Sequence, residues 1–94
     1  MRNAKKNETR NRMKADLERF AARIAAWERQ GMRIAEADND REMARLTRKD
    51  VRDLNAIYNA AKSGEFKKAA KLAYRLDTIV SDEIPARLYN AINR

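Results

Sequence analysis

Apolar residues in the first third of the chain recur every three or four positions, which is the spacing of one face of an α-helix. Five large apolar residues form this stripe: Met13, Leu17, Phe20, Ile24 and Trp27. They predict a helix from Glu8 to about Gln30, with alanines beside the stripe that leave a smooth flank for close packing. Gly31 stands where the stripe would continue, so we expect a break or kink there. A helix that continues through Gly31 with a weak point is the alternative.

The second half of the chain carries the start and stop signals of further helices. Thr47 followed by Asp50 is a variant of the capping box, in which two side chains bond the free N–H groups at a helix start. It predicts a helix from about 48 to 62. The preceding segment, 36–42, is polar and acidic, so we expect a turn or a solvated helical segment there.

A helical hairpin is predicted at about 48–80. Ser63 and Gly64 end its first helix, and apolar residues at helical spacing predict the second over about 65–80. Residues 58–69 resemble the middle of a tetratricopeptide repeat, where a Gly, an aromatic residue and an Ala let paired helices pack closely. The Trp-Leu-Gly part of that repeat is missing and no second copy follows. The resemblance therefore implies close helix packing and no binding residues.

Composition agrees with an all-α fold in a single small domain. The 94 residues contain only two Gly and one Pro, and Pro85 suits the first turn of a last helix. We expect a small bundle of four to five helices over residues 8–94, preceded by a basic flexible arm over residues 1–7. Seventeen of the apolar residues are Ala, which buries little area, so the core is thin. Such helices form either a tight monomer or a homodimer.

The residue types that the chain lacks exclude several kinds of chemistry. It has no Cys and no His, which removes disulfides, thiolate zinc sites and the commonest catalytic bases. The acidic segment from Asp38 begins like a calcium loop, but Met43 and Lys49 stand where that loop needs Gly and Glu. No apolar run approaches the roughly 20 residues that cross a bilayer. We therefore expect a soluble, cytoplasmic protein that is not an enzyme, binds no cofactor or metal ion and does not enter a membrane.

Positive charge is concentrated at the start of the chain. The sequence has 22 Lys and Arg against 14 Asp and Glu, a net charge of +8. Residues 1–14 contain one acid, Glu8, and six bases: Arg2, Lys5, Lys6, Arg10, Arg12 and Lys14. Lys and Arg that neutralise phosphates release condensed counterions, so a basic arm is typical of proteins that bind nucleic acid. A solubilising tail is the alternative.

Two further basic patterns fall on predicted helices. The helix predicted over 65–80 exposes a patch without an acid: Lys67, Lys68, Lys71, Tyr74 and Arg75. Its tyrosine can stack on a base or sugar, and an ordinary solvated helix face is the alternative. The second pattern is a stripe of guanidinium groups, which forms only if the helix continues through Thr47: Arg41, Arg45, Arg48 and Arg52. Acids are interleaved with this stripe and compensate part of its charge.

These patterns favour a small non-enzymatic helical protein that binds nucleic acid, or a nucleoprotein complex, through basic surfaces and largely independently of sequence. No helix-turn-helix, zinc or basic-zipper signature indicates base-specific recognition, and the residues do not distinguish DNA from RNA. The alternative is a protein–protein interaction module, such as a phage or mobile-element inhibitor or adaptor that binds a host protein complex. Trp27, the one Trp of the chain, is the candidate for that interface. Packing in the core is its alternative role.

Overall fold

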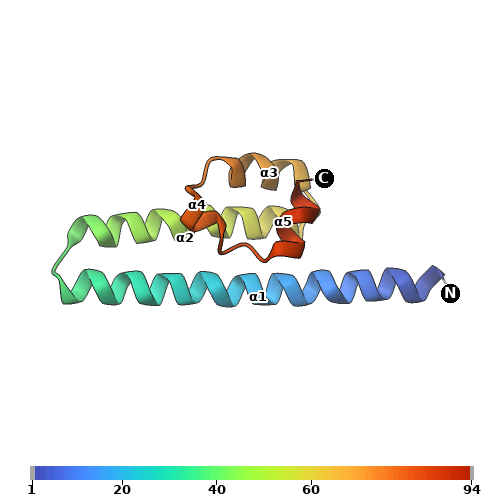
Figure 1. Cartoon of the computed structure of the whole chain (residues 1–94), viewed down its shortest axis with the longest axis horizontal. Helices are drawn as coiled ribbons and strands as arrows, with labels where there is room; N and C mark the ends of the chain where they lie inside the picture. Colours follow the sequence, from blue (N-terminus) through green and yellow to red (C-terminus); the bar gives the residue numbers. More distant parts are fainter. Residues whose placement is uncertain (1, 94) are drawn as a thin grey trace.

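The structure of the protein, a computed structural model, describes the backbone of residues 2–93 and the side chains of residues 12–93. Within that part of the chain it has five helices and no strand (Figure 1): α1 (Arg2–Ala37), α2 (Arg41–Lys62), α3 (Phe66–Tyr74), α4 (Thr78–Ser81) and α5 (Ala86–Ile92). The all-α class and the small bundle predicted from the periodicity are confirmed.

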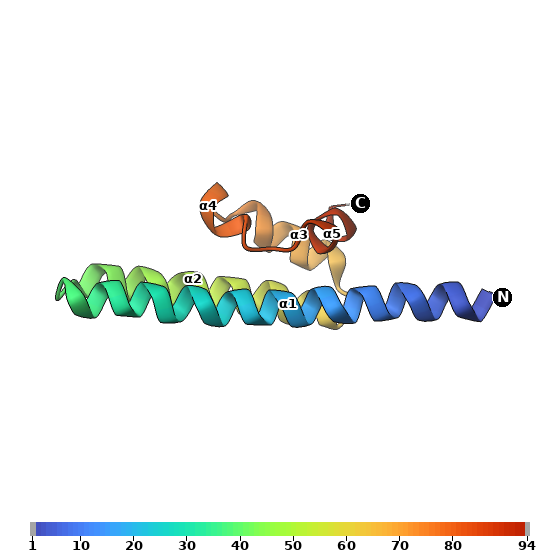
Figure 2. The same ribbon diagram turned by 60° about the horizontal axis from the view of Figure 1, so that its bottom comes forward.

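The two long helices, α1 and α2, form an antiparallel hairpin, and the three short helices lie together on one side of it (Figures 1 and 2). The molecule is elongated, 57 × 22 × 18 Å, because α1 alone has 36 residues and an α-helix rises about 1.5 Å per residue. The short helices cover only the part of the hairpin that lies away from the α1–α2 turn. The end of the hairpin near that turn is therefore two helices without a third.

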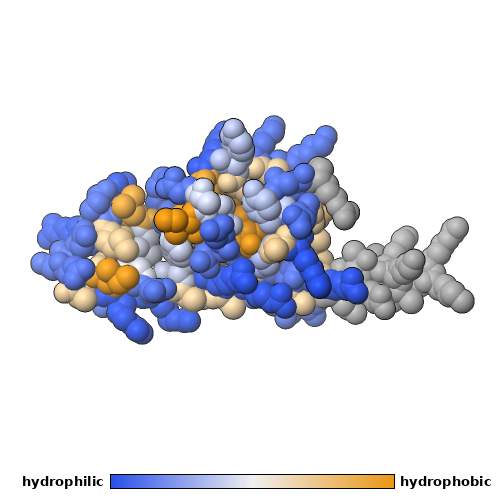
Figure 3. Space-filling view, in the orientation of Figure 1, coloured by the Kyte–Doolittle hydropathy of each residue, from blue (hydrophilic) through white to orange (hydrophobic). Residues whose placement is uncertain are grey.

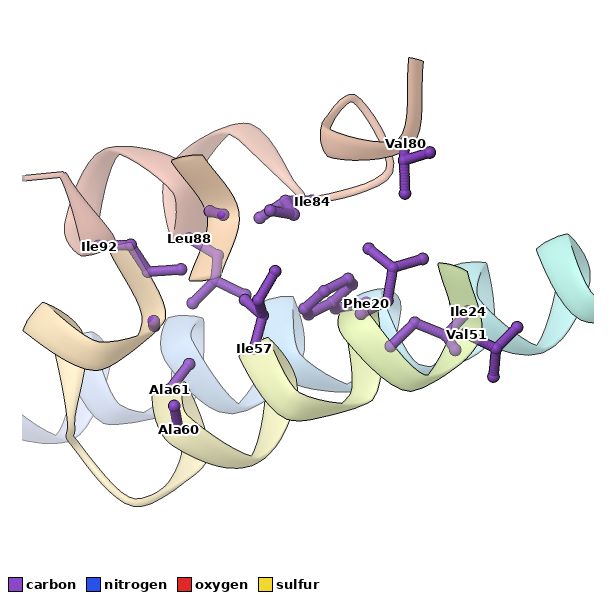
Figure 4. Close-up of a cluster of buried hydrophobic side chains, with 13 residues drawn as sticks. Phe20, Ile24, Val51, Ile57, Ala60, Ala61, Val80, Ile84, Leu88 and Ile92 are labelled. Carbon is purple, nitrogen blue, oxygen red and sulfur yellow. The ribbon is translucent and has the colours of Figure 1, made fainter. Parts of the chain in front are cut away.

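The core lies where the short helices meet the hairpin (Figure 4). Four large side chains are fully buried: Phe20, Leu54, Ile57 and Leu88. They come from α1, α2 and α5, so these three helices are joined through one apolar cluster. The rings of Phe20 and Tyr58 meet edge to face, with centroids 6.2 Å apart and an angle of 61° between their planes. Aromatic pairs favour this geometry because the positive edge of one ring meets the negative face of the other.

The predicted break at Gly31 is wrong, because α1 runs through this residue to Ala37. Gly31 is buried and faces Thr47 of α2. Without a Cβ atom at this position, the two helix backbones can lie close together. The glycine thus serves the crossing of two helices and does not end one.

The predicted start of the second helix after Thr47 is also wrong. α2 begins at Arg41, and the Asp40 Oδ1 atom accepts a hydrogen bond from the Met43 N–H at 3.0 Å, as an N-cap does. Thr47 lies inside the helix, where its hydroxyl donates to the Met43 carbonyl oxygen at 2.8 Å. Asn39, with a φ of 51°, makes the turn between α1 and α2. The acidic segment 36–42, expected to be a turn or a solvated helical segment, thus contains the turn, the cap of α2 and the adjoining helix ends.

The helix predicted over 65–80 is interrupted. α3 ends at Tyr74, and α4 follows after a short link. Asp77, with φ of −62° and ψ of 149°, is extended and stands at the N-cap of α4, a position that short polar side chains favour over a helix interior. α2 and α3 pack against each other across a link that contains Gly64, whose φ is 78°. The predicted helical hairpin is therefore present, with a second helix shorter than expected.

The first and last helices begin at slightly different positions from those predicted. α5 starts directly after Pro85. Pro85 is thus the N-cap, one position before the first turn in which the sequence placed it. α1 begins at Arg2, so its backbone includes most of the segment predicted as an arm. Met1 and the side chains of residues 2–11 lie outside the described part of the structure. The flexibility of the arm and the domain boundary at residue 8 stay predictions.

Candidate nucleic-acid interface

The five residues predicted as a site at α3 are all exposed to solvent: four lie within the helix, and Arg75 is its C-cap. These residues follow one another at intervals of three or four positions, so they share one side of the helix. They are Lys67, Lys68, Lys71, Tyr74 and Arg75. The Tyr74 side chain is 92% exposed, the largest exposure among the described large hydrophobic residues that reach the surface. A ring held in water at this exposure is free to stack on a planar group from outside.

Small residues on the opposite face hold α3 in this orientation. Ala69 and Ala73 are buried in the core cluster with Ala60 and Ala61 of α2. Alanine side chains are short, so the two helices pack with little between their backbones. Because α3 is fixed on its alanine face, its basic face is directed away from the hairpin.

The start of α3 lies beside α1. A shallow hollow at this point is lined by Met13 of α1, by Lys67 and Lys68 of α3, and by Ala91 of α5. Arg12 and Lys14 flank Met13 in the chain and are both exposed. The structure thus brings the described part of the basic N-terminal segment to the same end of the molecule as the first two lysines of α3.

The remaining four bases of the predicted arm precede this point on α1. They are Arg2, Lys5, Lys6 and Arg10, and their side chains lie outside the described part of the structure. Their backbone belongs to α1, and the N-terminal part of α1 extends beyond the C-terminal end of α2 (Figure 1). Their part in an interface stays a prediction.

The first turn of α3 offers backbone donors in the same hollow. Glu65 is the N-cap, and its side chain makes no capping hydrogen bond. The first hydrogen bond of the helix runs from the Ala69 N–H to the Glu65 carbonyl oxygen, at 3.0 Å. The N–H groups before Ala69 are therefore left without an intrahelical acceptor, and the positive end of the helix dipole is at this point. Glu65 is the one acid that lines the hollow, and its charge opposes an incoming anion.

A second hollow lies at the other end of α3. It is lined by Lys71, Tyr74 and Arg75 together with Ala70 and Asn93. No acid contributes to it. The two cations stand on either side of the exposed ring in the sequence, so a base on the ring would have its phosphates within reach of a positive charge.

The charges of the α3 face are not neutralised by acids within the described part of the chain. There the ion pairs are Arg19 with Asp16, Arg45 with Glu42, and Lys49 with Asp53. None of them includes a base of α3. The positive potential of this face is therefore available to a polyanion.

The predicted arginine stripe exists, because α2 is helical through Thr47. All four of its members are exposed on one side of α2: Arg41, Arg45, Arg48 and Arg52. Two acids reduce its charge: the Arg45 Nε–H donates to Glu42 Oε2 at 3.1 Å, and Glu28 lies in the same hollow as Arg48 and Arg52. The hydrogen bond from Arg45 lowers the pKa of Glu42, and the same bond raises the pKa of Arg45. The stripe is thus a mixed surface.

Trp27 packs against the core, which was its alternative role, and its part in a protein interface stays a prediction. It is half-buried and packs against the core cluster, and it also lines a groove near the α1–α2 turn with Ile34 of α1 and Leu46 of α2. The sequence analysis missed Ile34 and Leu46. A signal for them was present, because Ile34 is seven residues after Trp27 and Leu46 is three residues after Met43, spacings that share a helix face.

The acidic residues near the turn are used in the fold. Asp40 caps α2, and Glu42 is paired with Arg45. Among residues 12–93, no three acidic side chains converge in an arrangement that could hold a metal ion. Over the described helices, none is both long enough and apolar enough to cross a membrane.

Comparison of the chain with models of protein families, with curated proteins and with solved structures gave no match.

Proposed function

We propose that this protein binds nucleic acid through the phosphate backbone, without catalysis and largely independently of base sequence. The observation that carries the proposal is the exposed face of α3, which carries four cations and a tyrosine that is 92% exposed. No acid interrupts this face, and no described acid pairs with it. Arg12 and Lys14 are exposed on either side of Met13 in the chain, and Met13 lines the hollow with Lys67 and Lys68.

The dimensions of α3 suit a short stretch of backbone. Lys67 and Arg75 are eight residues apart, which is about 12 Å along a helix. One strand of a duplex has a phosphate about every 3.4 Å of axis but winds around that axis, so a straight face of this length meets a few of its phosphates. Lysine side chains contact phosphates as point charges and carry no sequence information, which accounts for binding independent of sequence.

The test is fluorescence anisotropy of labelled single-stranded and double-stranded oligonucleotides from low to physiological salt. The first variant replaces the four bases of the α3 face, Lys67, Lys68, Lys71 and Arg75, by Ala. Because all four are exposed, the variant keeps the core. If each contacts a phosphate, the slope of log K against log salt becomes less steep by about three to four.

A matched control removes the same number of bases from another surface. It replaces Arg41, Arg45, Arg48 and Arg52 of α2 by Ala, which changes the net charge by the same amount. The proposal requires the α3 variant to lose more affinity and more salt dependence than this control. Equal losses would show that only net charge matters, and binding that does not depend on salt would contradict a phosphate contact altogether.

A further inference from the structure

An apolar groove remains open at the end of the hairpin that α3, α4 and α5 do not cover. Trp27 and Ile34 of α1 line one wall, Met43 and Leu46 of α2 line the other, and the volume is about 340 Å³. Figures 1 and 2 show that no helix lies over this end in either view. Apolar side chains are visible there in Figure 3, on both long helices near the turn.

The groove continues the surface on which the short helices pack. Phe20 and Ile24 of α1 lie in the core beneath them, and Trp27 follows one turn later along the same stripe. Figure 4 shows Ile24 and Val51 with Val80 of α4 at one end of the covered core. Beyond that end, α1 and α2 form a similar groove between them, and no described helix packs in it.

Two aliphatic residues of the walls are open to solvent. Ile34 and Leu46 are each 41% exposed although both are large and aliphatic. The floor between them is tight, because Gly31 and Thr47 bring the two helices together and both are buried. The side chains above this floor therefore stand apart and leave room for an inserted ridge of apolar residues.

Acidic charge lies at the end of the groove that is farther from the α1–α2 turn. Asp50 lines it and is partly buried, and Asp53 and Asp77 lie close enough for their charges to act on it. Desolvation and these two acids raise the pKa of Asp50, while the hydrogen bond from Trp27 and the charge of Lys49 act in the opposite direction. In a chain with a net charge of +8, this acidic end is a local exception. A cation placed there would stabilise the Asp50 carboxylate.

We propose that this groove binds an amphipathic α-helix of another protein, with its apolar ridge between Trp27, Ile34 and Leu46 and a Lys or Arg of the ridge paired with Asp50. Short helices dock in apolar grooves in this way through residues at i, i+3, i+4 and i+7. The size of the groove favours a single helix, because eight residues line it and a standard protein interface uses about 20–30 a side. Charge disfavours a second copy, since two copies facing through this groove would bring like acids together.

The test uses the fluorescence of Trp27, the only Trp of the chain, with a synthetic probe. The probe is an 18-residue helical peptide without Trp, with Leu at i, i+3, i+4 and i+7 and one Arg at the end of this ridge. A second peptide carries Glu in place of the Arg. The Arg peptide is expected to shift the Trp27 emission to shorter wavelength in a saturable titration, with about tenfold higher affinity than the Glu peptide.

Two variants and a control assign the binding to the groove. Leu46→Glu is expected to weaken binding at least tenfold, and Asp50→Lys to abolish the preference for the Arg peptide. Ile79→Glu is the control, because Ile79 is 72% exposed on α4 and does not line the groove. It should bind as the natural chain does.

The opposite results overturn the inference. Absence of a saturable shift with both peptides would show that the groove takes no helix. An equal loss in Leu46→Glu and Ile79→Glu would show that binding is non-specific. Sedimentation that reveals a dimer, lost in Leu46→Glu, would assign the groove to a second copy. None of these outcomes bears on the oligonucleotide titrations, so the inference and the proposed function fail independently.

Discussion

A Cβ atom at Gly31 would lie 2.5 Å from Cγ2 of Thr47, a separation that real Cβ contacts essentially never show. The Thr47 side chain cannot move away easily, because its hydroxyl is bonded to the Met43 carbonyl oxygen at 2.8 Å and β-branched side chains have few rotamers in a helix. These two residues therefore set the distance between α1 and α2 near the turn.

Gly31→Ala is expected to destabilise the protein, although Ala is the better helix former by about 1 kcal/mol. Overpacking against a fixed neighbour costs about 1–3 kcal/mol, so the net loss in the free energy of unfolding is at most about 2 kcal/mol. Urea denaturation followed by circular dichroism measures it. In a Thr47→Ala background the two closest contacts are removed and only the Cβ atom of residue 47, at 3.0 Å, remains, so the same substitution should cost much less or become neutral. Identical losses in both backgrounds would disprove the contact.

Asp40→Ala is expected to lower stability by about 1 kcal/mol, because it removes the oxygen that satisfies the Met43 N–H. Thermal unfolding measures the change. Glu65→Ala is the matched control: Glu65 is also an N-cap, but its side chain makes no capping bond. The prediction fails if the two substitutions lower the melting temperature equally.

Asp50→Asn is expected to stabilise the protein near neutral pH and to have a smaller effect in acid. The pKa of Asp50 is raised in the folded state above the ordinary value of 3.8, first by desolvation. The folded state therefore binds this proton at higher pH than the unfolded state, and the Asp50 contribution to stability falls as pH rises through the raised pKa. Asn keeps an acceptor for Trp27 and carries no charge.

The measurement for Asp50 is the difference between variant and natural chain in urea denaturation at several pH values. The difference is needed because the pKa of Glu42 is lowered and its contribution runs the other way with pH. A gain from Asp50→Asn that is constant from pH 7 down to pH 3 would exclude titration of Asp50 as its cause.

Tyr74→Ala is expected to weaken single-stranded oligonucleotide binding by about fivefold or more, since stacking of a base on an aromatic ring contributes about 1–3 kcal/mol. Tyr74→Phe keeps the ring and should bind nearly as the natural chain does. Because Tyr74 is 92% exposed, neither change should alter the melting temperature. Loss of affinity in both variants would indicate a role for the hydroxyl, and no loss in either would remove stacking from the interface.

Much of the fold was predictable from periodicity because apolar spacing reports which face of a helix is buried. The stripe that includes Phe20 and Ile24 is in the core, and the α3 face that includes Lys67 and Tyr74 is exposed. These are properties of one helix considered alone. The buried and exposed faces of each helix could therefore be predicted from its own residues, without knowing which helix packs against it.

The predictions at Gly31 and Thr47 were wrong because one residue type can serve two structural purposes. A glycine ends a helix or allows two helices to cross, and only the position of Thr47 opposite Gly31 distinguishes the two. A threonine caps a helix or lies within one, and Asp40, seven residues earlier in the chain, already satisfied the helix start. The groove at Trp27 was missed because its openness depends on where the short helices stop.

The packing of α5 has a consequence for how the protein is made. Leu88 and Ile92 complete the cluster around Phe20, yet Leu88 is synthesised 68 residues after Phe20. A nascent chain can pair α1 with α2 through contacts near the turn, but it keeps Phe20 exposed until the final helix arrives. Closure of the core thus waits for α5, and a chain that lacks Leu88 and Ile92 would present Phe20 to chaperones and proteases.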